Sequence, residues 1–453
     1  MENILKINLP SKVKFLLERL INNNYDAFVV GGAVRDSILG LPVSDYDITT
    51  NALPNQVKEV FIGFEVIETG IKHGTVTVVL EDEMFEITTF RIDGEYIDNR
   101  HPESVEFTSN LIDDLSRRDF TVNALAADIN GKVIDYFNGI ADLKAGLIRC
   151  VGDADQRFNE DALRILRALR FAAKLNFFIF PLTATSIHAN KHLLKNIANE
   201  RIQKEFNLLL LSKYPSKTSN ILSEYFDVFE EVIPYLSKLN INQNNKYHRH
   251  NSLVAHTLAV TEGVESDLEL KLAAFFHDIG KADCYSEEVF EDGTIQGHFY
   301  GHPEVSAVLV EEILRELKYS NEIIDEVVWL VKYHDYTIAD TKRSVRKFLM
   351  KCPSMDYFEK LLKLKISDRA DHINLEEKYR EYPDKILEIR DKIIEEQDIF
   401  SLKDLAINGY DMIALGLKGP EIGKALTDAL EAVIEEQAPN DKQSLIDFVK
   451  SQI

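Results

Sequence analysis

The sequence is poor in cysteine, in proline and in long apolar runs, and each shortage excludes a class of protein. Its three cysteines, Cys150, Cys284 and Cys352, lie far apart without a CxxC pair, which argues against a disulfide framework or a thiolate zinc site. With 20 glycines and 12 prolines among 453 residues, the chain is neither fibrous nor of low complexity. No run of about 18 apolar residues occurs, and the N-terminal segment lacks the pattern of a signal peptide. We therefore expect a cytoplasmic protein without a membrane span.

Basic residues are also in the minority. The chain has 52 lysines and arginines against 75 aspartates and glutamates, a formal net charge of −23. This balance argues against a protein that coats nucleic acid through a general basic field, but a local basic strip can still hold a polynucleotide. Apolar residues make up 45% of the chain, which is typical of a packed globular protein, and the length indicates about three domains.

Three regions of the chain differ in their pattern of apolar residues. Residues 25–150 alternate short strand-like runs with turns, whereas residues 153–240 have apolar residues at the three- and four-residue spacing of helices. A polar stretch over residues 237–251 is the best candidate for a linker, and the helical pattern continues beyond it. We therefore expect an α/β head, followed by an all-α neck, body and tail, at residues 1–150, 151–240, 241–373 and 374–453.

The head contains a strand-to-helix turn with two adjacent glycines. The apolar run 27–30 leads into Gly31 and Gly32, and a short helical pattern follows. Glycines at such a turn let backbone N–H groups approach phosphate closely, and the start of a helix favours negative charge. Arg35 can then clamp phosphate oxygens. A glycine turn alone, however, is more often a plain strand–turn–helix junction.

The next strand-like run adds two carboxylates to this turn. Asp45 and Asp47 are two residues apart, so in an extended chain both side chains point to the same face. Two neighbouring carboxylates repel each other and need a cation, and their oxygens suit Mg²⁺, with water and nucleotide phosphates as its remaining ligands. A glycine turn followed by such a pair indicates a nucleotidyltransferase head in which Asp45 and Asp47 are the catalytic, metal-binding residues.

Several motifs make the chain similar to a known family. They are GGAVRD, DYDIT, ITTFR (87–91), YIDNRHPESVEF (96–107), RRDFTVNALA (117–126) and EDALRILRALRF (160–171). In content and order they resemble the DNA polymerase β-like superfamily, and specifically the bacterial class II CCA-adding enzymes and their poly(A) polymerase relatives. The resemblance implies that Gly32, Arg35 and Arg118 bind the nucleotide, and that Asp45 and Asp47 bind Mg²⁺.

Two residues of the head have a second interpretation. Glu86, on the strand-like run MFEITTF, is a candidate third carboxylate at the metal, but strands also place polar residues outward without any function. Arg118 belongs to the motif RRDF, and a guanidinium both binds phosphate in a bidentate manner and never loses its charge. The same motif is also typical of a basic surface turn, where charges are simply solvated.

Arginines recur every third residue at the start of the neck. We predict one helix from Glu160 to Arg170, in which Arg164, Arg167 and Arg170 form a stripe headed by Asp161. Its opposite face is apolar. For an isolated segment, an amphipathic helix with ion pairs along its surface is the simplest interpretation.

When this segment follows a nucleotidyltransferase head in the chain, it can also recognise the base of the incoming nucleotide. A carboxylate accepts hydrogen bonds and a guanidinium donates them, which matches CTP and ATP, where an exocyclic amine lies beside a ring-nitrogen acceptor. UTP and GTP have a carbonyl in place of the amine. The family resemblance agrees, since EDALR matches the base-selecting motif: Asp161 and Arg164 select the base, Glu160 orients Arg164, and Arg167 and Arg170 make further nucleotide contacts.

The body contains histidines and aspartates in a particular order. The residues are His256, His277, Asp278, His302, His334 and Asp368. A lone histidine on an apolar helix is usually structural, but imidazoles and carboxylates from several helices can converge on one metal.

This order and the segment FFHDIGK resemble the HD phosphohydrolase superfamily, and some bacterial CCA-adding enzymes carry such a domain. The resemblance implies four ligands for a divalent transition metal and two further members of the site: His256, His277, Asp278 and Asp368, and then His302 and His334. Asp371 is an alternative to Asp368, because the two can share a helix face. A degenerate HD domain that keeps only the fold is the alternative for the whole region.

The sequence therefore predicts a CCA-adding tRNA nucleotidyltransferase that uses Mg²⁺ and takes CTP, ATP and a tRNA 3′ end. A poly(A) polymerase, or an enzyme that adds only CC or only A, is the alternative within the class. The segment ETGIKHGTVTVV lacks the basic element typical of poly(A) polymerases, and YIDNRHP (96–102) resembles a loop that CC-only enzymes lack. The alternative from a different functional class is an HD phosphohydrolase whose head only binds nucleotide. We also expect metal-dependent phosphohydrolase activity, on substrates such as 2′,3′-cyclic phosphates.

Overall fold

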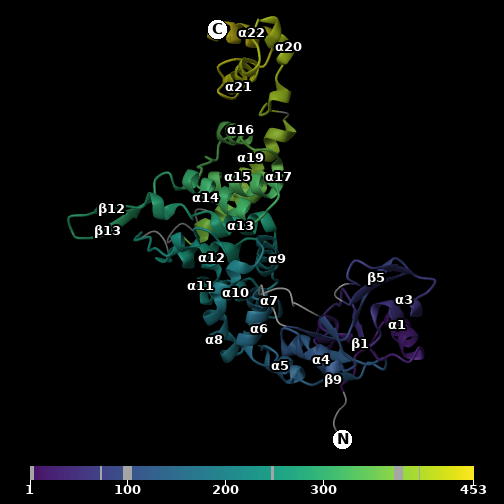
Figure 1. The fold of residues 1–453 in the computed structure, drawn as a ribbon. Coiled ribbons are helices and arrows are strands. Elements are labelled where there is room, and N and C mark those ends of the chain that lie inside the picture. Colours follow the sequence, from purple (N-terminus) through teal and green to yellow (C-terminus); the bar gives the residue numbers. More distant parts are fainter. Residues whose placement is uncertain (1–4, 72–73, 95–104, 246–248, 372–380, 397) are drawn as a thin grey trace. The chain divides into compact units, whose positions relative to one another are not determined.

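The computed structural model describes residues 5–71, 74–94, 105–245, 249–371, 381–396 and 398–453 (Figure 1). By its internal contacts the chain divides into two compact units, Met1–Pro234 and Tyr235–Ile453. The expected four-part division at residues 150, 240 and 373 is finer than these two units and stays a prediction.

The first unit is built on a mixed seven-stranded sheet. Its strands run in the order β3 (Glu65–Ile67), β4 (Thr75–Leu80), β5 (Glu83–Thr89), β2 (Asp47–Thr50), β1 (Ala27–Val30), β8 (Leu125–Ala127) and β9 (Val133–Asp135). The β2–β5 pair is parallel and the other pairs are antiparallel. Alternation of apolar and polar residues produces β4 and β5, in which Val76, Val78, Phe85 and Ile87 are buried.

Short helices and two small ribbons surround this sheet. They are α1 (Ser11–Asn22), α2 (Gly32–Ile38), α3 (Pro54–Val60), α4 (Leu111–Ser116), α5 (Gly139–Ala145), the 3₁₀ turn η2 (Thr121–Asn123), the pair β6 (Arg91–Asp93) with β7 (Val105–Phe107), and the pair β10 (Leu147–Ile148) with β11 (Phe178–Ile179). The amphipathic helix α1 buries Val13, Leu16, Leu17 and Leu20.

The rest of the first unit is helical. It consists of α6 (Ala154–Glu160), α7 (Leu163–Leu175), α8 (Pro181–Asn190), η3 (Lys191–Asn196), α9 (Asn199–Leu210), α10 (Pro215–Glu224) and α11 (Phe226–Glu230).

The single helix predicted from Glu160 to Arg170 is wrong at its start. Helix α6 ends at Glu160, and Asp161 has an extended backbone with φ −138° and ψ 102°. The cause is local, because the carboxylate of Asp161 accepts a hydrogen bond from the backbone N–H of Leu163 at 3.1 Å. Aspartate side chains compete in this way with helix continuation. The break separates Asp161 from the arginine stripe and places it at the head of α7.

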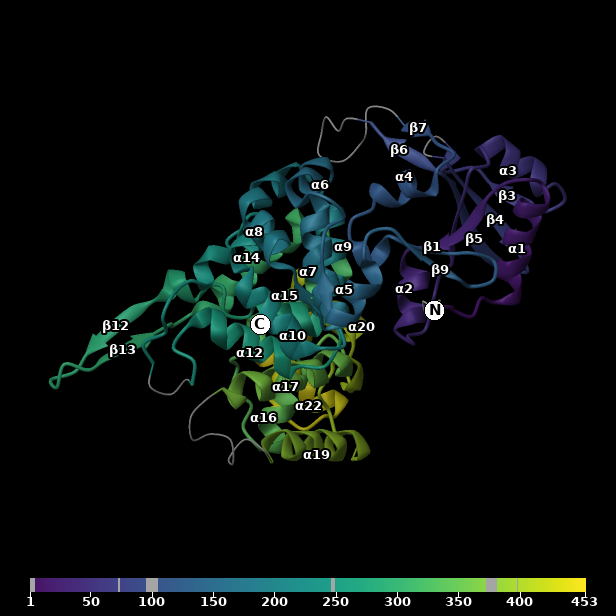
Figure 2. The same ribbon diagram turned by 90° about the horizontal axis from the view of Figure 1, so that it is seen from below.

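The second unit is almost wholly helical. Its elements are η4 (Leu236–Leu239), α12 (Leu253–Gly263), α13 (Leu268–Phe276), η5 (Lys281–Cys284), α14 (His302–Glu316), α15 (Asn321–Tyr333), α16 (Lys342–Leu349), α17 (Met355–Ala370), α19 (Tyr382–Glu395), η6 (Leu402–Asp404), α20 (Gly409–Ala414), α21 (Pro420–Ile434) and α22 (Lys442–Gln452). Helix α13 is mostly apolar, with Glu269 and Lys271 as its charged residues, and lies in contact with α12, α15 and α17. A hairpin of β12 (Ser286–Val289) and β13 (Ile295–His298) extends from these helices (Figure 2).

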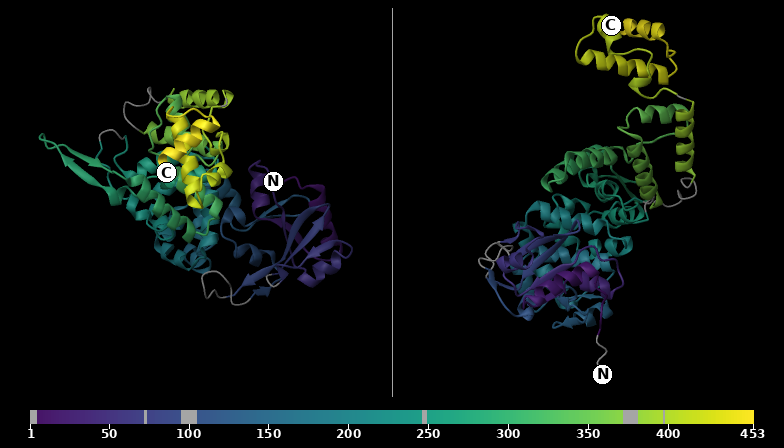
Figure 3. Two further views of the ribbon diagram at one scale, coloured as in Figure 1. Left: turned by 90° about the horizontal axis from the view of Figure 1, so that it is seen from above. Right: turned by 90° about the vertical axis from the view of Figure 1, so that its right-hand side faces the viewer.

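The last helices have a core of their own. Helices α20, α21 and α22 pack around Met412, Leu430 and Leu445 (yellow in Figure 3). Among the described residues, none of the helices has the length and apolar character that crossing a membrane requires. The expected α/β head is confirmed. The remainder is largely helical but not all-α as predicted, because β11 lies in the neck and the β12–β13 hairpin lies in the body. The cytoplasmic location stays a prediction.

Candidate functional site

Strand pairing in the head brings the glycine turn beside the first carboxylates. Val30, the last residue of β1, lies opposite Asp47, the first residue of β2. The chain then turns at Gly31, whose φ of 73° is in the left-handed region that favours glycine. The Cβ of any other residue at position 31 would lie 2.9 Å from Arg118 Nη1. The turn therefore needs glycine both for its backbone and for the close approach of a guanidinium.

Three carboxylates gather at this turn. The parallel pairing of Ile48 with Ile87 places Glu86 next to Asp47 on the neighbouring strand, and Asp45 precedes β2 by two residues. The pKa of Asp47 is raised, first by desolvation and then by the charges of Glu86 and Asp45, while Arg118 opposes the rise. Three neighbouring carboxylates of like charge form a donor set of hard oxygens, which fits Mg²⁺.

Arg118 lies on the other side of the turn. Its Nη2 is 3.5 Å from Asp114 Oδ2, and Asp114 is fully buried. Arg117 donates to the other oxygen of Asp114, from Nη2 at 2.7 Å. Within the part of the chain that the structure describes, Arg118 Nε is buried without a hydrogen-bond partner. A buried guanidinium with spare donors beside a glycine turn can bind an anion such as phosphate.

Arg35 is more enclosed than its predicted role implies. Its guanidinium donates to Asp36 Oδ1 at 2.7 Å and to Asn123 Oδ1 at 2.5 Å, and it lies 5.0 Å from the ring centre of Phe171. The side chain therefore links α2 to η2 and α7. Its Nη2 would lie 3.6 Å from a Cβ at Gly32, so the guanidinium also borders the turn.

The predicted base-reading residues lie at the junction of α6 and α7. Arg164 donates from Nη1 to Glu160 Oε2 at 2.7 Å and from Nη2 to the backbone oxygen of Arg117 at 2.9 Å. Glu160 therefore orients Arg164, as the sequence predicts. Asp161 is held from α9, where Arg201 Nη2 lies 3.1 Å from its Oδ2.

The two remaining arginines of the stripe face buried acids rather than solvent. Arg167 donates from Nη2 to Asp119 Oδ2 at 2.8 Å, and Arg170 forms an ion pair with Glu205 of α9. Arg167 holds the pKa of Asp119 down at about 2 in spite of burial, which acts in the opposite direction. The surface stripe of the sequence interpretation is therefore a charged seam inside the first unit, and the nucleotide contacts of Arg167 and Arg170 stay predictions.

In the second unit, four imidazoles point the same nitrogen toward one carboxylate. The Nδ1 atoms of His277, His302 and His334 lie 2.6–2.9 Å from backbone carbonyl oxygens, and that of His256 lies 2.8 Å from Asp371 Oδ2. Such partners favour Nδ1 as the proton-bearing nitrogen of the neutral ring, so that Nε2 is the nitrogen directed at the centre of the cluster. All four Nε2 atoms lie 3.1–3.6 Å from an oxygen of Asp278.

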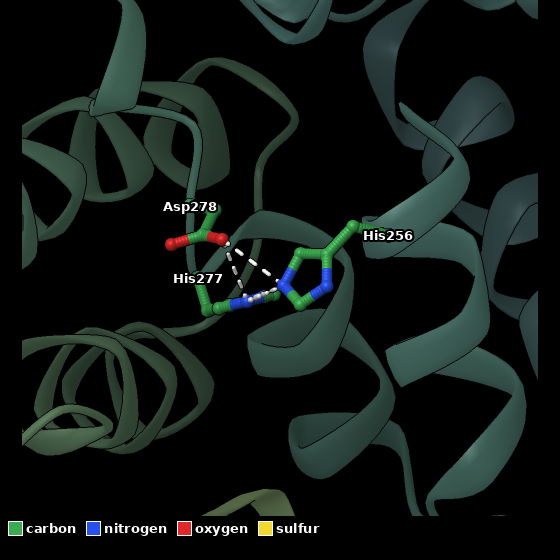
Figure 4. A group of neighbouring side chains, drawn as sticks. All are labelled: His256, His277 and Asp278. Atoms are coloured by element: carbon green, nitrogen blue, oxygen red, sulfur yellow. Dashed lines mark hydrogen bonds and ion pairs between the residues drawn. The ribbon is translucent and has the colours of Figure 1, made fainter. Parts of the chain in front are cut away.

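Asp278 itself is suited to a cation. Its side chain is 1% exposed, and among the described residues neither oxygen has a hydrogen bond of acceptable geometry, although Lys281 Nζ lies 2.7 Å away. Figure 4 shows Asp278 facing His256 and His277. Burial lowers the pKa of His256, but the nearby carboxylates of Asp278, Asp368 and Asp371 outweigh this and raise that pKa to about 10. The cluster therefore stabilises positive charge at its centre.

The structure separates the two candidate aspartates of α17. Asp368 Oδ1 lies 3.3 Å from His256 Nε2, on the side where the imidazoles converge. Asp371 instead binds His256 Nδ1 and also contacts His250 Nδ1 at 2.5 Å. Asp368 therefore lies on the side where the imidazoles converge and Asp371 lies behind His256, while the role of Asp368 as a metal ligand stays a prediction. A cavity of about 280 Å³ borders Asp278, His302, His334 and Asp368.

Sequence reasoning missed three residues of these sites, namely Asp114, Arg201 and Glu205. Arg201 and Glu205 pair with residues that are distant in sequence, so spacing does not reveal them, whereas Asp114 pairs with Arg117 and Arg118 at the three- and four-residue spacing of a helix. Glu205 had one usable signal, since it falls on the apolar face of α9 between the buried Ile202 and Leu209. The segment YIDNRHP (96–102) lies entirely outside the described residues.

Three family models match the chain. They are described as “Poly A polymerase head domain” over residues 27–149, “Probable RNA and SrmB- binding site of polymerase A” over residues 176–239, and “tRNA nucleotidyltransferase domain 2 putative” over residues 302–449. The first contains the glycine turn and the carboxylates.

Curated relatives and a solved structure extend the likeness to the whole chain. The CCA-adding enzyme of Ligilactobacillus salivarius is 46% identical over 223 residues, which span 49% of this chain and 54% of that enzyme. The enzyme of the same name from Lactiplantibacillus plantarum is 32% identical over 448 residues, covering 96% of this chain and 95% of that one. The crystal structure of the Bacillus stearothermophilus CCA-adding enzyme in complex with CTP is 27% identical, with a TM-score of 0.68 over 97% of this chain and 96% of that chain.

The sheet, the glycine turn and the carboxylates define a nucleotidyltransferase head on a helical remainder. Together with the full-length likeness, they show that the chain belongs to the family of CCA-adding enzymes. The prediction of a CCA-adding tRNA nucleotidyltransferase is thereby confirmed.

Proposed function

We propose that Asp45, Asp47, Arg118, Asp161 and Arg164 carry out the stepwise addition of CTP and ATP to a tRNA 3′ end. The observation that carries this proposal is the pairing of Val30 with Asp47, which brings a phosphate-binding turn beside the metal-side carboxylates. A related structure contains CTP, and a structural neighbour from Thermotoga maritima, at 20% identity and TM-score 0.60, is described as complexed with tRNA.

In the proposed reaction, the tRNA 3′ oxygen forms a bond to the α-phosphorus of the nucleotide. The bond between the α-phosphorus and the bridging oxygen breaks, and pyrophosphate leaves with that electron pair. Backbone N–H groups at Gly31 and Gly32, with the guanidinium of Arg118, bind the triphosphate and its developing charge. Arg35 stabilises the turn from behind and borders Gly32.

Asp45 and Asp47 would hold Mg²⁺, and Glu86 is the third carboxylate within reach. When bound, the ion acidifies the attacking hydroxyl and neutralises phosphate charge. The raised pKa of Asp47 supports this assignment, because a carboxylate crowded by others gains most from a cation.

Base selection is assigned to the junction of α6 and α7. Asp161 accepts from the exocyclic amine of C or A, and Arg164 donates to the neighbouring ring nitrogen. Arg164 contacts Glu160 and the backbone carbonyl of Arg117. These contacts hold its guanidinium close in the chain to Arg118, which follows Arg117. This neighbourhood favours one site that binds the triphosphate and reads the base.

Purified protein incubated with tRNA lacking its 3′ end, and with single nucleotides or mixtures, tests the proposal. We expect CCA ends from CTP with ATP, and CC ends from CTP alone. Long A tails or a stop after CC would instead establish one of the two alternatives within the class. The matched curated relatives are named CCA-adding enzymes, which favours full CCA addition.

We also propose a metal-dependent phosphohydrolase site of the HD type in the second unit. Two overlapping groups support it, His256, His277 and Asp278 in one and Asp278, His302 and His334 in the other. The imidazole-rich donor set fits a divalent transition metal, and Asp368 adds a carboxylate. When bound, the metal supplies an acidified water. A phosphodiester such as a 2′,3′-cyclic phosphate at a damaged tRNA end suits this site, since nucleotide addition needs a free 3′ hydroxyl.

Hydrolysis of a generic phosphodiester, with Ni²⁺, Co²⁺ or Mn²⁺ supplied after chelation, tests this second activity. We expect turnover that disappears in Asp278→Ala while nucleotide addition persists. If no metal supports turnover, and elemental analysis finds none bound, the region is a degenerate HD domain.

A further inference from the structure

Arg201 reaches Asp161 from a separate helix. It lies in the first turn of α9, and its guanidinium contacts both carboxylate oxygens, with Nη1 3.4 Å from Oδ1 and Nη2 3.1 Å from Oδ2. Both side chains are largely shielded, with exposed fractions of 27% and 20%. A two-point contact of this kind fixes the plane of a carboxylate as well as its position.

Helix α9 is itself firmly placed. It packs along α7, buries Ile202, Phe206 and Leu209, and contributes Glu205 to the ion pair with Arg170 one turn beyond Arg201. The same helix therefore contributes Arg201, which contacts Asp161 before α7, and Glu205, which contacts Arg170 within α7. The backbone of Arg201 therefore belongs to a helix that is packed against α7.

The contacts of Asp161 occupy most of the hydrogen-bond acceptor positions on its carboxylate. A carboxylate has about four acceptor positions. Oδ1 accepts from the Leu163 N–H at 3.1 Å and faces Arg201 Nη1, while Oδ2 faces Arg201 Nη2. Within the described residues, this leaves one lone pair, on Oδ2. One fixed acceptor matches the single exocyclic amine that distinguishes C from U and A from G.

We propose that Arg201 is a specificity-determining positioning residue, which holds Asp161 so that one oxygen is presented to the amine of the incoming base. This inference rests on the proposed role of Asp161 in base selection. Without Arg201, the carboxylate can rotate about its Cβ–Cγ bond, and a water molecule can bridge it to a carbonyl of U or G. Discrimination then falls even though Asp161 is still present.

Ratios of kcat/KM between bases of equal size test the proposal. The CTP/UTP ratio is measured on tRNA lacking CCA, and the ATP/GTP ratio on tRNA ending in CC. We expect Arg201→Gln to lower both ratios about tenfold, which is the usual value of one good base contact. Lys204→Gln, which removes the same charge from an exposed position of the same helix, should leave them unchanged. Each ratio is taken within one preparation, so a loss of folded protein cancels.

The double variant separates positioning from a merely structural role. If Arg201 acts through Asp161, Arg201→Gln in an Asp161→Asn background should lower the ratios no further than Asp161→Asn alone. Equal losses of rate with all four nucleotides, or effects that multiply in the double variant, would overturn the inference. If Asp161→Asn itself keeps both ratios, the proposed base-reading role fails as well. Arg201→Lys, which keeps the charge but not the two-point contact, should still show reduced ratios.

Discussion

Val30 and Asp47 face each other at the end of the antiparallel pair of β1 and β2. This one pairing unites two functions that are separate in sequence, because Val30 leads into the glycine turn and Asp47 begins the carboxylate set. The parallel partner β5 then adds Glu86 on the other side of Asp47. The chemistry of the head follows from three adjacent strands of one sheet.

Replacing Asp45 or Asp47 with alanine should reduce nucleotide addition by about a thousandfold or more, since metal-assisted charge stabilisation is worth several kcal/mol. Binding of tRNA, measured by filter retention, should change little, because these groups hold metal rather than RNA. Asp82→Asn, at the exposed turn before β5, is the control and should keep the normal rate. Normal turnover in both alanine variants would remove these residues from the mechanism.

Glu86→Gln should raise the Mg²⁺ concentration needed for half-maximal rate. It removes one negative charge beside Asp47 while preserving the size of the side chain. Glu83 lies on the same strand but pairs with Lys12. The Mg²⁺ dependence of the Glu83→Gln variant should therefore match that of the unchanged protein. Identical Mg²⁺ curves for the two variants would show that Glu86 is an ordinary strand residue.

Removing one partner of the Arg170–Glu205 ion pair should strongly destabilise the first unit. Their side chains are 10% and 6% exposed, so Glu205→Gln leaves a buried guanidinium without its countercharge and should cost about 3 kcal/mol. Urea unfolding followed by circular dichroism measures the loss.

Arg170→Met in the Glu205→Gln background should recover part of that loss, because the buried charge is then gone. Glu200→Gln, exposed on the same helix, should change the free energy of unfolding by less than about 0.5 kcal/mol. A double variant whose loss in free energy of unfolding equals the sum of the two single losses would contradict the pairing.

Mn²⁺ should stabilise the chain through the histidine cluster of the second unit. A ligand present at a hundred times its Kd stabilises the folded state by about 2.7 kcal/mol, which appears as a rise in Tm. His277→Ala should abolish that rise and leave nucleotide addition intact, whereas the exposed His192→Ala should keep both. An equal Tm rise in His277→Ala would place the metal elsewhere.

The amount of local structure that the sequence alone predicts differs between the head and the neck. In the head, short-range rules were enough: a strand, two glycines and an Asp-x-Asp pair predict the turn and the metal-side face, because turn and strand geometry repeat over a few residues. In the neck, the three-residue spacing predicts a helix but not its break. The competing bond from Asp161 to the Leu163 N–H is one local detail among several that the same residues allow.

What the sequence by itself determined is the order of the motifs, the residue types at each site and the change from strands to helices. Only the tertiary structure decided which acids the arginines meet, that Arg201 holds Asp161, and that Asp368 rather than Asp371 faces the cluster. The physical reason is that spacing along a helix or strand fixes which face a side chain occupies, whereas its partner depends on how distant elements pack. Asp368 and Asp371 are nearly equivalent along α17, and the position of His256 on α12 distinguishes them.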